Sequence, residues 1–225
     1  MLLPRLLLET GAIAVTQLAV YIGFAVRGLL IGEEGIWKSA QLAAMQVAVA
    51  AAGGIGLTLL IGEPTDAPLL HRTLSRIDAS FPPPREILTD VATAVILFDV
   101  VFYILHRLMH TRLLYGRIHS RHHLAHIPSP FAVVHAHPLD YLLTQAFPVM
   151  ALVRLLNAHA VTMVIVGSSG LLAAMYSHSG DLMGVMSHRK HHRQPTKHFG
   201  VLGLADAVAQ RVEYVLSRIM GGPAR

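Results

Sequence analysis

The chain has 225 residues, of which 53% are hydrophobic and 14% are charged, whereas a soluble domain has about 25% charged residues. It contains no cysteine, which excludes disulfides, thiolate metal sites and iron–sulfur clusters within these residues. Residues 1–105 hold six Lys/Arg and nine Asp/Glu, and residues 106–225 hold twelve and four. Because the basic residues flank apolar runs, we expect a membrane protein whose histidine-bearing face is cytoplasmic, and not a nucleic-acid-binding protein.

Long apolar runs predict an all-α, multi-pass helical membrane protein. A membrane helix needs about 20 mostly apolar residues, and five runs come close to that length: 11–31, 39–62, 87–105, 138–156 and 159–176. The polar segment before the third run ends in FPPP, so the third helix is expected to begin only after these prolines. The same segment contains three arginines, which would lie on the non-cytoplasmic side if all three first runs crossed. The number of spans therefore stays open.

The chain divides into three expected parts. Residues 1–86 form N-terminal spans and a polar connector, and residues 87–206 carry the histidine motifs. Residues 207–225 form a C-terminal tail at the surface, since the stretch from 201 to 220 is only weakly amphipathic.

Histidines are concentrated in two short stretches. Thirteen of the fifteen fall within residues 106–137 and 178–198. HRLMH (106–110) places two imidazoles four residues apart on one helix face. HSRHH (119–123) and HRKHH (188–192) share a second spacing, HxxHH. In a helix, adjacent histidines differ by about 100° and can serve two different metals. The candidate ligands are His106, His110, His119, His122, His123, His137, His178, His188, His191 and His192.

Other interpretations of these histidines fit the sequence less well. A zinc-protease HExxH motif is excluded at HRLMH because Arg107 stands where the glutamate would be. A solvated, pH-sensitive basic surface would not explain the recurring helical spacing. Isolated His71 and His159 are interpreted as structural or solvated. The roles of three histidines near the clusters stay open: His126, His135 and His198.

Three polar residues are candidates for supporting the ligands. Asp99 and Tyr103 lie on the same helix stripe as His106, but Asp99 is about 10 Å along the axis and too far to be an obvious ligand. It is expected to orient Tyr103 or a histidine of a neighbouring helix. Asp140, three residues after His137, could orient a ligand or cap a helix. Imidazole suits zinc, copper, iron and nickel alike, so the spacing predicts only a polynuclear histidine site at a membrane surface.

The ordered motifs resemble the fatty acid hydroxylase / sterol desaturase superfamily of integral membrane di-metal oxygenases. The matching elements are DVVFYILHRLMH (99–110), HSRHH (119–123), HPLD (137–140), HSG (178–180), HRKHH (188–192) and, more weakly, KHFG (197–200) with Asp206. The stretch LADAVAQRV departs from the family, which usually has a Trp before the late Asp and a Gly-Thr after it.

This resemblance implies a cytosolic histidine cap that holds two iron ions, for which zinc can substitute. It implies an O2-dependent enzyme that hydroxylates or desaturates an apolar lipid such as a fatty acyl chain, sterol or isoprenoid. Electrons would come from a separate ferredoxin- or cytochrome-type protein. It assigns nine histidines as ligands, and His137 as a tenth that varies among members. The alternative from another class is a membrane metal-binding or transport protein, which would usually need ionisable ligands at mid-membrane.

Overall fold

The computed structural model describes residues 2–30, 36–61, 81–124, 129–179 and 188–220. These residues form helices and turns without strands, which confirms the expected all-α class. The α-helices are α1 (Leu2–Leu30), α2 (Ile36–Ile61), α3 (Pro84–Met109), α4 (Pro138–Tyr141), α5 (Phe147–Leu155), α6 (Ala160–Ser179), α7 (His188–Arg193) and α8 (Leu204–Ile219). Two 3₁₀-helices, η2 (His119–Leu124) and η3 (Pro130–Val134), and the π-helix η4 (Leu142–Ala146) complete the fold.

Prolines set where two of the helices begin. Helix α3 begins at Pro84, directly after Pro83 in an extended conformation, as the FPPP sequence predicts. Helix α4 begins at Pro138, and the chain continues through the π-helix into α5. The predicted run 138–156 is therefore interrupted by one wide turn, a feature that often lies at functional sites.

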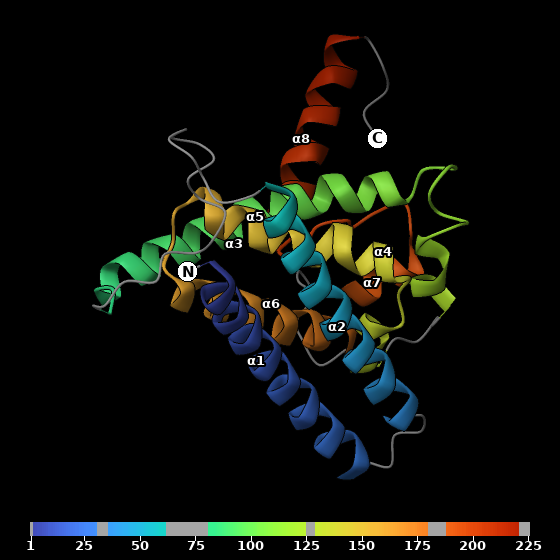
Figure 1. The fold of residues 1–225 in the computed structure, drawn as a ribbon. Helices are drawn as coiled ribbons and strands as arrows, with labels where there is room; N and C mark the ends of the chain where they lie inside the picture. Colours follow the sequence, from blue (N-terminus) through green and yellow to red (C-terminus); the bar gives the residue numbers. More distant parts are fainter. Residues whose placement is uncertain (1, 31–35, 62–80, 125–128, 180–187, 221–225) are drawn as a thin grey trace.

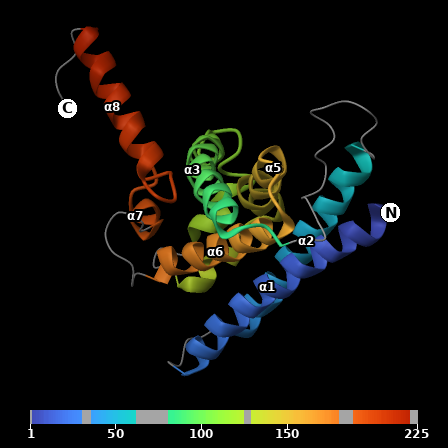
Figure 2. The ribbon, with the colours of Figure 1, turned by 90° about the vertical axis from the view of Figure 1, so that its left-hand side faces the viewer.

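Helix α6 is packed between the other long helices. One hydrophobic core joins α1, α2 and η3 to the C-terminal half of α6, through residues such as Phe24, Val134 and Met175. A second core joins α3 and α5 to its N-terminal half, through residues such as Ala94, Val153 and Met163. Helices α1 and α2 lie side by side, and α8 projects away from the rest of the molecule (Figures 1 and 2). The histidine-bearing α7 and η2 lie at one end of this bundle.

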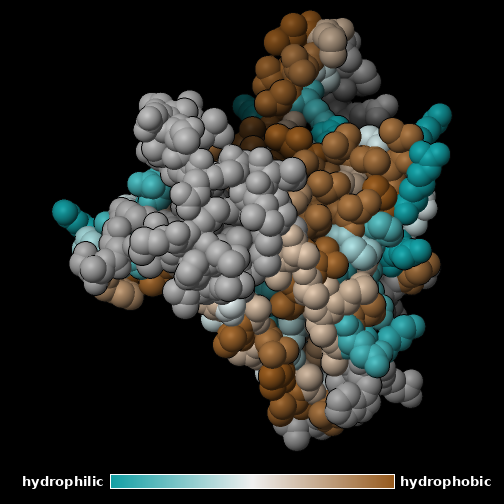
Figure 3. Space-filling model, viewed as in Figure 1, coloured by the Kyte–Doolittle hydropathy of each residue, from teal (hydrophilic) through white to brown (hydrophobic). Residues whose placement is uncertain are grey.

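Within the described part of the chain, two helices, α3 and α6, are long and apolar enough to cross a membrane, and two shorter apolar segments cover Gly11–Val26 and Pro138–Val153. Only 11% of the most apolar part of α3 is buried. Apolar side chains on this helix are exposed, among them Leu88, Ile96 and Ile104. Exposed apolar side chains also make up much of the face of the projecting α8 that Figure 3 shows. Such exposed surface on a helix of this length is unusual for the core helix of a soluble protein.

Candidate metal centre

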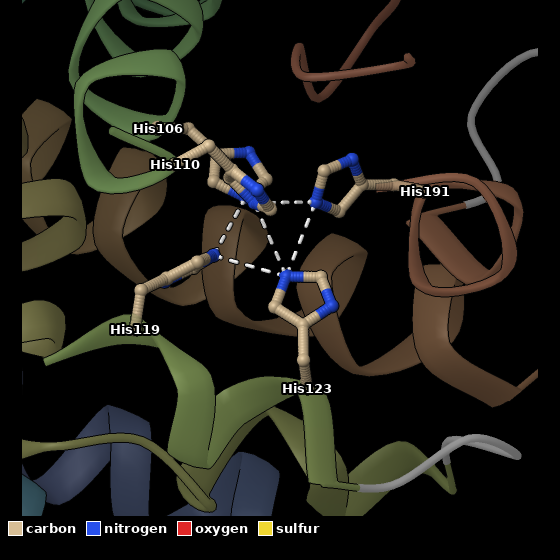
Figure 4. A group of neighbouring side chains, drawn as sticks. All are labelled: His106, His110, His119, His123 and His191. Carbon is tan, nitrogen blue, oxygen red and sulfur yellow. Dashed lines mark hydrogen bonds between the residues drawn. The ribbon is translucent and has the colours of Figure 1, made fainter. Parts of the chain in front are cut away.

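Nine of the ten predicted ligands converge into two groups. Within each group, the available nitrogens lie within 4.8 Å of one another. Cluster one consists of His106, His110, His119, His123 and His191, and cluster two of His122, His178, His188 and His192. In Figure 4 the five imidazoles of cluster one point toward one another from α3, η2 and α7. Residues up to 85 positions apart in the sequence thus meet at one place.

The two HxxHH motifs are interleaved between the clusters. In HSRHH, His119 and His123 belong to cluster one and His122 to cluster two. In HRKHH the assignment is reversed: His188 and His192 belong to cluster two, and His191 belongs to cluster one. Adjacent histidines therefore serve different groups, as helical geometry predicts. The second motif lies on a short α-helix as expected, whereas the first forms a 3₁₀-helix.

The spacing of the nitrogens fits a common cation in each cluster. In cluster one, Nε2 of His191 lies 2.9 Å from Nε2 of His110. In cluster two, Nε2 of His122 lies 3.2 Å from Nε2 of His192 and 3.4 Å from Nε2 of His178. Imidazole nitrogens bound to one ion at about 2.1 Å, with angles between octahedral and tetrahedral, lie about 3.0–3.4 Å apart. Such converging lone pairs would repel one another without a cation.

The imidazoles are electrically suited to bind metal. Burial, with repulsion from neighbouring imidazoles, lowers the pKa of His110 to about 3 and that of His123 to about 2. The same causes lower the pKa of His192 to about 3. They hold the pKa values of His122 and His188 well below 6.5. These side chains are therefore neutral at pH 7, the form in which an imidazole can bind a metal.

Hydrogen bonds on the outer nitrogens fix the orientation of four rings. Nδ1 of His106 donates to the Phe199 carbonyl at 2.8 Å, and Nδ1 of His191 donates to the Lys197 carbonyl at 2.7 Å. Nδ1 of His178 donates to the carbonyl of Ala174 within α6. A proton on Nδ1 leaves the lone pair of Nε2 directed into the cluster.

The fourth ring, that of His119, is oriented by Asp140. Orienting a ligand was one of the two roles expected for this residue. Nδ1 of His119 donates to its carboxylate at 2.7 Å, and both side chains are almost fully buried. We expect Asp140→Asn to weaken metal retention by about 10–100-fold, because the neutral amide no longer raises the basicity of the ring. Metal remaining per chain after a timed chelator challenge measures this effect. An unchanged rate of loss would contradict it.

Asp99 does not orient Tyr103 or a histidine in the structure, contrary to our expectation. Its fully buried carboxylate instead accepts backbone N–H groups from Val201, Leu202 and Ala205 at 2.6–2.8 Å. Asp206 accepts two more N–H groups from the same segment, those of residues 199 and 200. The two carboxylates thus hold the segment that supplies the Phe199 carbonyl to His106.

Gly200 lies between these carboxylates. A Cβ at this position would lie 2.8 Å from Oδ2 of Asp206 and 3.0 Å from Oδ1 of Asp99. No side chain fits there, which explains a glycine in the KHFG sequence.

Tyr103 also contacts the segment that contains Phe199. Its hydroxyl accepts a hydrogen bond from Nη1 of Arg107 at 2.6 Å, and its ring packs edge-on against Phe199. Phe199 in turn packs against three rings of cluster one: His106, His110 and His191. Sequence reasoning did not single out Phe199, since one phenylalanine in a polar loop carries no periodic signal.

The remaining histidines lie outside both clusters or outside the described residues. Nδ1 of His137 accepts the Leu139 N–H at the start of α4, and the side chain belongs to neither cluster. His159 similarly accepts the Val161 N–H at the start of α6. Nε2 of His135 lies 3.3 Å from the Ser39 hydroxyl, and His198 has a left-handed backbone with φ of 59°. His71 and His126 are not among the described residues.

A cavity of about 350 Å³ extends from cluster two into the helical bundle. Its wall includes His122, His178 and His188 but no member of cluster one. The rest is mainly apolar and comes from α1, α2, α3, α5 and α6. On α6 the lining reaches from His178 back to Met163, which corresponds to about 22 Å of helix. The cavity is therefore long and narrow.

Fold and site together define a helical protein with two neighbouring histidine clusters that could each hold a metal ion, beside an apolar cavity. Residues 91–210 match the Fatty acid hydroxylase family, and the chain belongs to that family. The predicted relationship is thereby confirmed. The match includes all nine clustered histidines as well as Asp99 and Asp206.

Individual relatives cover parts of the same region. The chain is 26% identical over 133 residues to Fatty acid hydroxylase ahd1 of Mycosarcoma maydis, covering 57% of this chain and 35% of that protein. It is 28% identical over 123 residues to Fatty acid hydroxylase domain-containing protein 2 of Homo sapiens, covering 53% and 37%. It is 40% identical over 62 residues to Lathosterol oxidase of Mus musculus, covering 28% and 20%. The matches thus span about a third or less of each relative. No solved structure matches this chain.

Proposed function

We propose that this protein is an O2-dependent di-iron oxidoreductase that hydroxylates or desaturates an apolar lipid. The observation that carries this proposal is the apolar cavity whose wall contains three imidazoles of cluster two. A metal held there would face an alkyl or ring carbon of a lipid and not bulk water. The relatives' names, a fatty acid hydroxylase and a lathosterol oxidase, support the same substrate class.

The nine clustered histidines would hold the two metals, with five nitrogens in cluster one and four in cluster two. All-nitrogen ligands fit iron, and zinc would be accepted by the same donors. Bound iron supplies the O2 activation that amino acid side chains cannot provide. Cluster two, with four nitrogens, leaves more room for a further ligand than cluster one. Cluster two is also the cluster that adjoins the cavity. His137 is not required in this assignment.

The polypeptide positions the substrate and excludes water. Phe102 packs against His106 and His188 and also lines the cavity, so it joins these rings to the apolar wall. Val201 and Leu202 line the same end and are held in place by Asp99. A lipid carbon in this end of the cavity would be surrounded by imidazole and hydrocarbon, which restricts side reactions with solvent.

The surface supports a membrane location. We propose that α3 and α6 cross the bilayer together with other apolar segments, with the histidine clusters on the cytoplasmic side. Substrate would then reach the cavity from the bilayer. Electrons would come from a separate ferredoxin- or cytochrome-type protein, because cysteine-ligated clusters cannot form within these residues.

Metal content and O2 consumption test the proposal. Purified protein is expected to contain about two irons per chain and to oxidise lipid only when O2 and an electron donor are supplied. A metal-free form with full activity would refute it. Flux of metal ions into liposomes without lipid oxidation would favour the transport alternative.

Filling the cavity should block the reaction without disturbing the fold. Gly170 on α6 lines the cavity, and a Cβ added there meets no atom within 4 Å. We expect Gly170→Leu to lower turnover at least tenfold while metal content stays unchanged, because the side chain would occupy the space of the substrate. Lipid product and iron per chain are measured on the same sample.

Gly23→Leu is the matched control. Gly23 is also a helical glycine with open space around its Cβ position, but it lies outside the cavity. Normal turnover in both variants would show that the cavity does not hold the substrate.

A further inference from the structure

Ser169 and Ser177 line the cavity, but their hydroxyls donate to carbonyls within α6; three further uncharged polar side chains interrupt the apolar wall. Gln17 comes from α1, Tyr141 from the end of α4, and Gln145 from the π-helix. The wide turn of the π-helix brings Gln145 to the same cavity as Tyr141, four residues earlier. Polar groups in an apolar environment are costly unless they are hydrogen-bonded, so their presence in this wall needs an explanation.

The hydrogen-bonding capacity of this group is only partly used. Gln17 is hydrogen-bonded to the hydroxyl of Tyr141, whose side chain is 3% exposed. Oε1 of Gln17 is buried and has no partner among the described residues. If the amide N–H₂ of Gln17 donates to the phenolic oxygen, the Tyr141 O–H remains available as a donor and Oε1 as an acceptor. The pair therefore offers one donor and one acceptor.

The position of the group relative to the metals follows from helix packing. Helices α1 and α6 run in the same direction, since Phe24 contacts Tyr176 near the metal end and Ile13 packs with the core group around Met163. Gln17 therefore lies opposite the middle of α6, near Ser169. Nine residues separate Ser169 from His178, which corresponds to about 13 Å.

The cavity wall also restricts the charge of the ligand. Among the described residues that line it there is no Lys, Arg, Asp or Glu. A carboxylate or phosphate bound inside would lack a cationic partner, which is strongly unfavourable in an apolar cavity. A neutral hydroxyl, with one donor and one acceptor, matches the two free functions of the pair.

We infer that Gln17, Tyr141 and Gln145 form a subsite for the hydroxyl of a lipid alcohol. This inference rests on the proposed function and deepens it, because it names the substrate class of the same cavity. The substrate is a largely apolar molecule with a neutral hydroxyl, and its oxidised carbon lies at the end of the cavity formed by cluster two. Free fatty acids and pure hydrocarbons are poorer ligands.

Matched lipid probes test the subsite without requiring turnover. Wild-type protein in nanodiscs is titrated with 1-octadecanol, octadecane and octadecanoic acid, and with cholesterol and cholestane, by displacement of the tritiated alcohol. We expect at least one alcohol to bind about tenfold more tightly than its hydrocarbon, and octadecanoic acid to bind less tightly than 1-octadecanol.

Two variants locate the preference. The double variant Gln17→Leu/Tyr141→Phe removes both hydrogen-bonding partners together, which avoids leaving one of them unpaired. It should bind alcohol and hydrocarbon alike while keeping its metal content. Ser169→Ala is the control, because this cavity-lining hydroxyl already donates to the Ile165 carbonyl at 2.6 Å. It should keep the preference for alcohol.

The results separate this inference from the proposed function. Equal binding of both alcohols and their hydrocarbons to wild-type protein, a preference for the acid, or a preference that survives in the double variant would overturn the subsite. Intact alcohol preference without any O2-dependent product would leave the subsite standing and refute the oxidoreductase proposal.

Discussion

His122→Ala is expected to remove the metal of cluster two and to lower lipid oxidation at least 100-fold. Nε2 of His122 contacts those of His178, His188 and His192, so it lies at the centre of the four-nitrogen group. Three nitrogens would remain around a buried site that faces an apolar cavity. Iron per chain should fall from about two toward one, measured by elemental analysis alongside product formation.

His191→Ala is expected to have the same effect on cluster one, where His191 contacts His110 and His123. His135→Ala serves as the control, since His135 lies outside both clusters and its Nε2 lies near the Ser39 hydroxyl. If all three variants keep both metals and full activity, the ligand assignment is wrong.

Asp99→Ala is expected to destabilise the protein by about 3–5 kcal/mol although Asp99 binds no metal. The substitution leaves three N–H groups without their acceptor, that of buried Ala205 and those of half-buried Val201 and Leu202, and an unsatisfied buried group costs about 1–3 kcal/mol. The segment after Lys197 would also lose its anchor, so the Phe199 carbonyl would no longer hold His106. Thermal unfolding and iron content both report this loss.

Asp99→Asn distinguishes hydrogen bonding from simple packing. The amide oxygen can still accept from Val201 and Leu202, but its N–H₂ would oppose the N–H of Ala205. An intermediate unfolding temperature is expected. Glu213→Gln, which removes an acid from an exposed pair with Arg107, should change little. Equal behaviour of Asp99→Ala and Glu213→Gln would disprove the anchoring role.

The convergence of the histidines was predictable because it is visible in their spacing. Imidazoles four apart recur in HRLMH, HSRHH and HRKHH, and the structure places each such pair in one cluster. The separation of His122 from His123 also follows from helical rotation. Residue types and local periodicity were sufficient here, since few side chains other than histidine could fill these positions.

The anchoring of the site was not predictable in the same way. Asp99 was rightly singled out as an ionisable residue in an apolar helix, but its partners lie more than 100 residues later in a loop without periodicity. The Gln17 and Tyr141 pair depends on how α1 and α4 pack. Pro148 just after the π-helix signals a disturbed helix, since it has no N–H for the Thr144 carbonyl, but it does not specify a π-turn. These features depend on tertiary contacts that one-dimensional patterns do not contain.

The interleaved motifs have a consequence for how the centre is assembled. Each HxxHH segment carries donors for both clusters, so fixing the backbone of η2 or α7 around one ion also fixes donors for the other. A first ion would thereby lower the conformational entropy cost of binding the second. Ion uptake is then cooperative, and chains with a single ion should be scarce at intermediate loading.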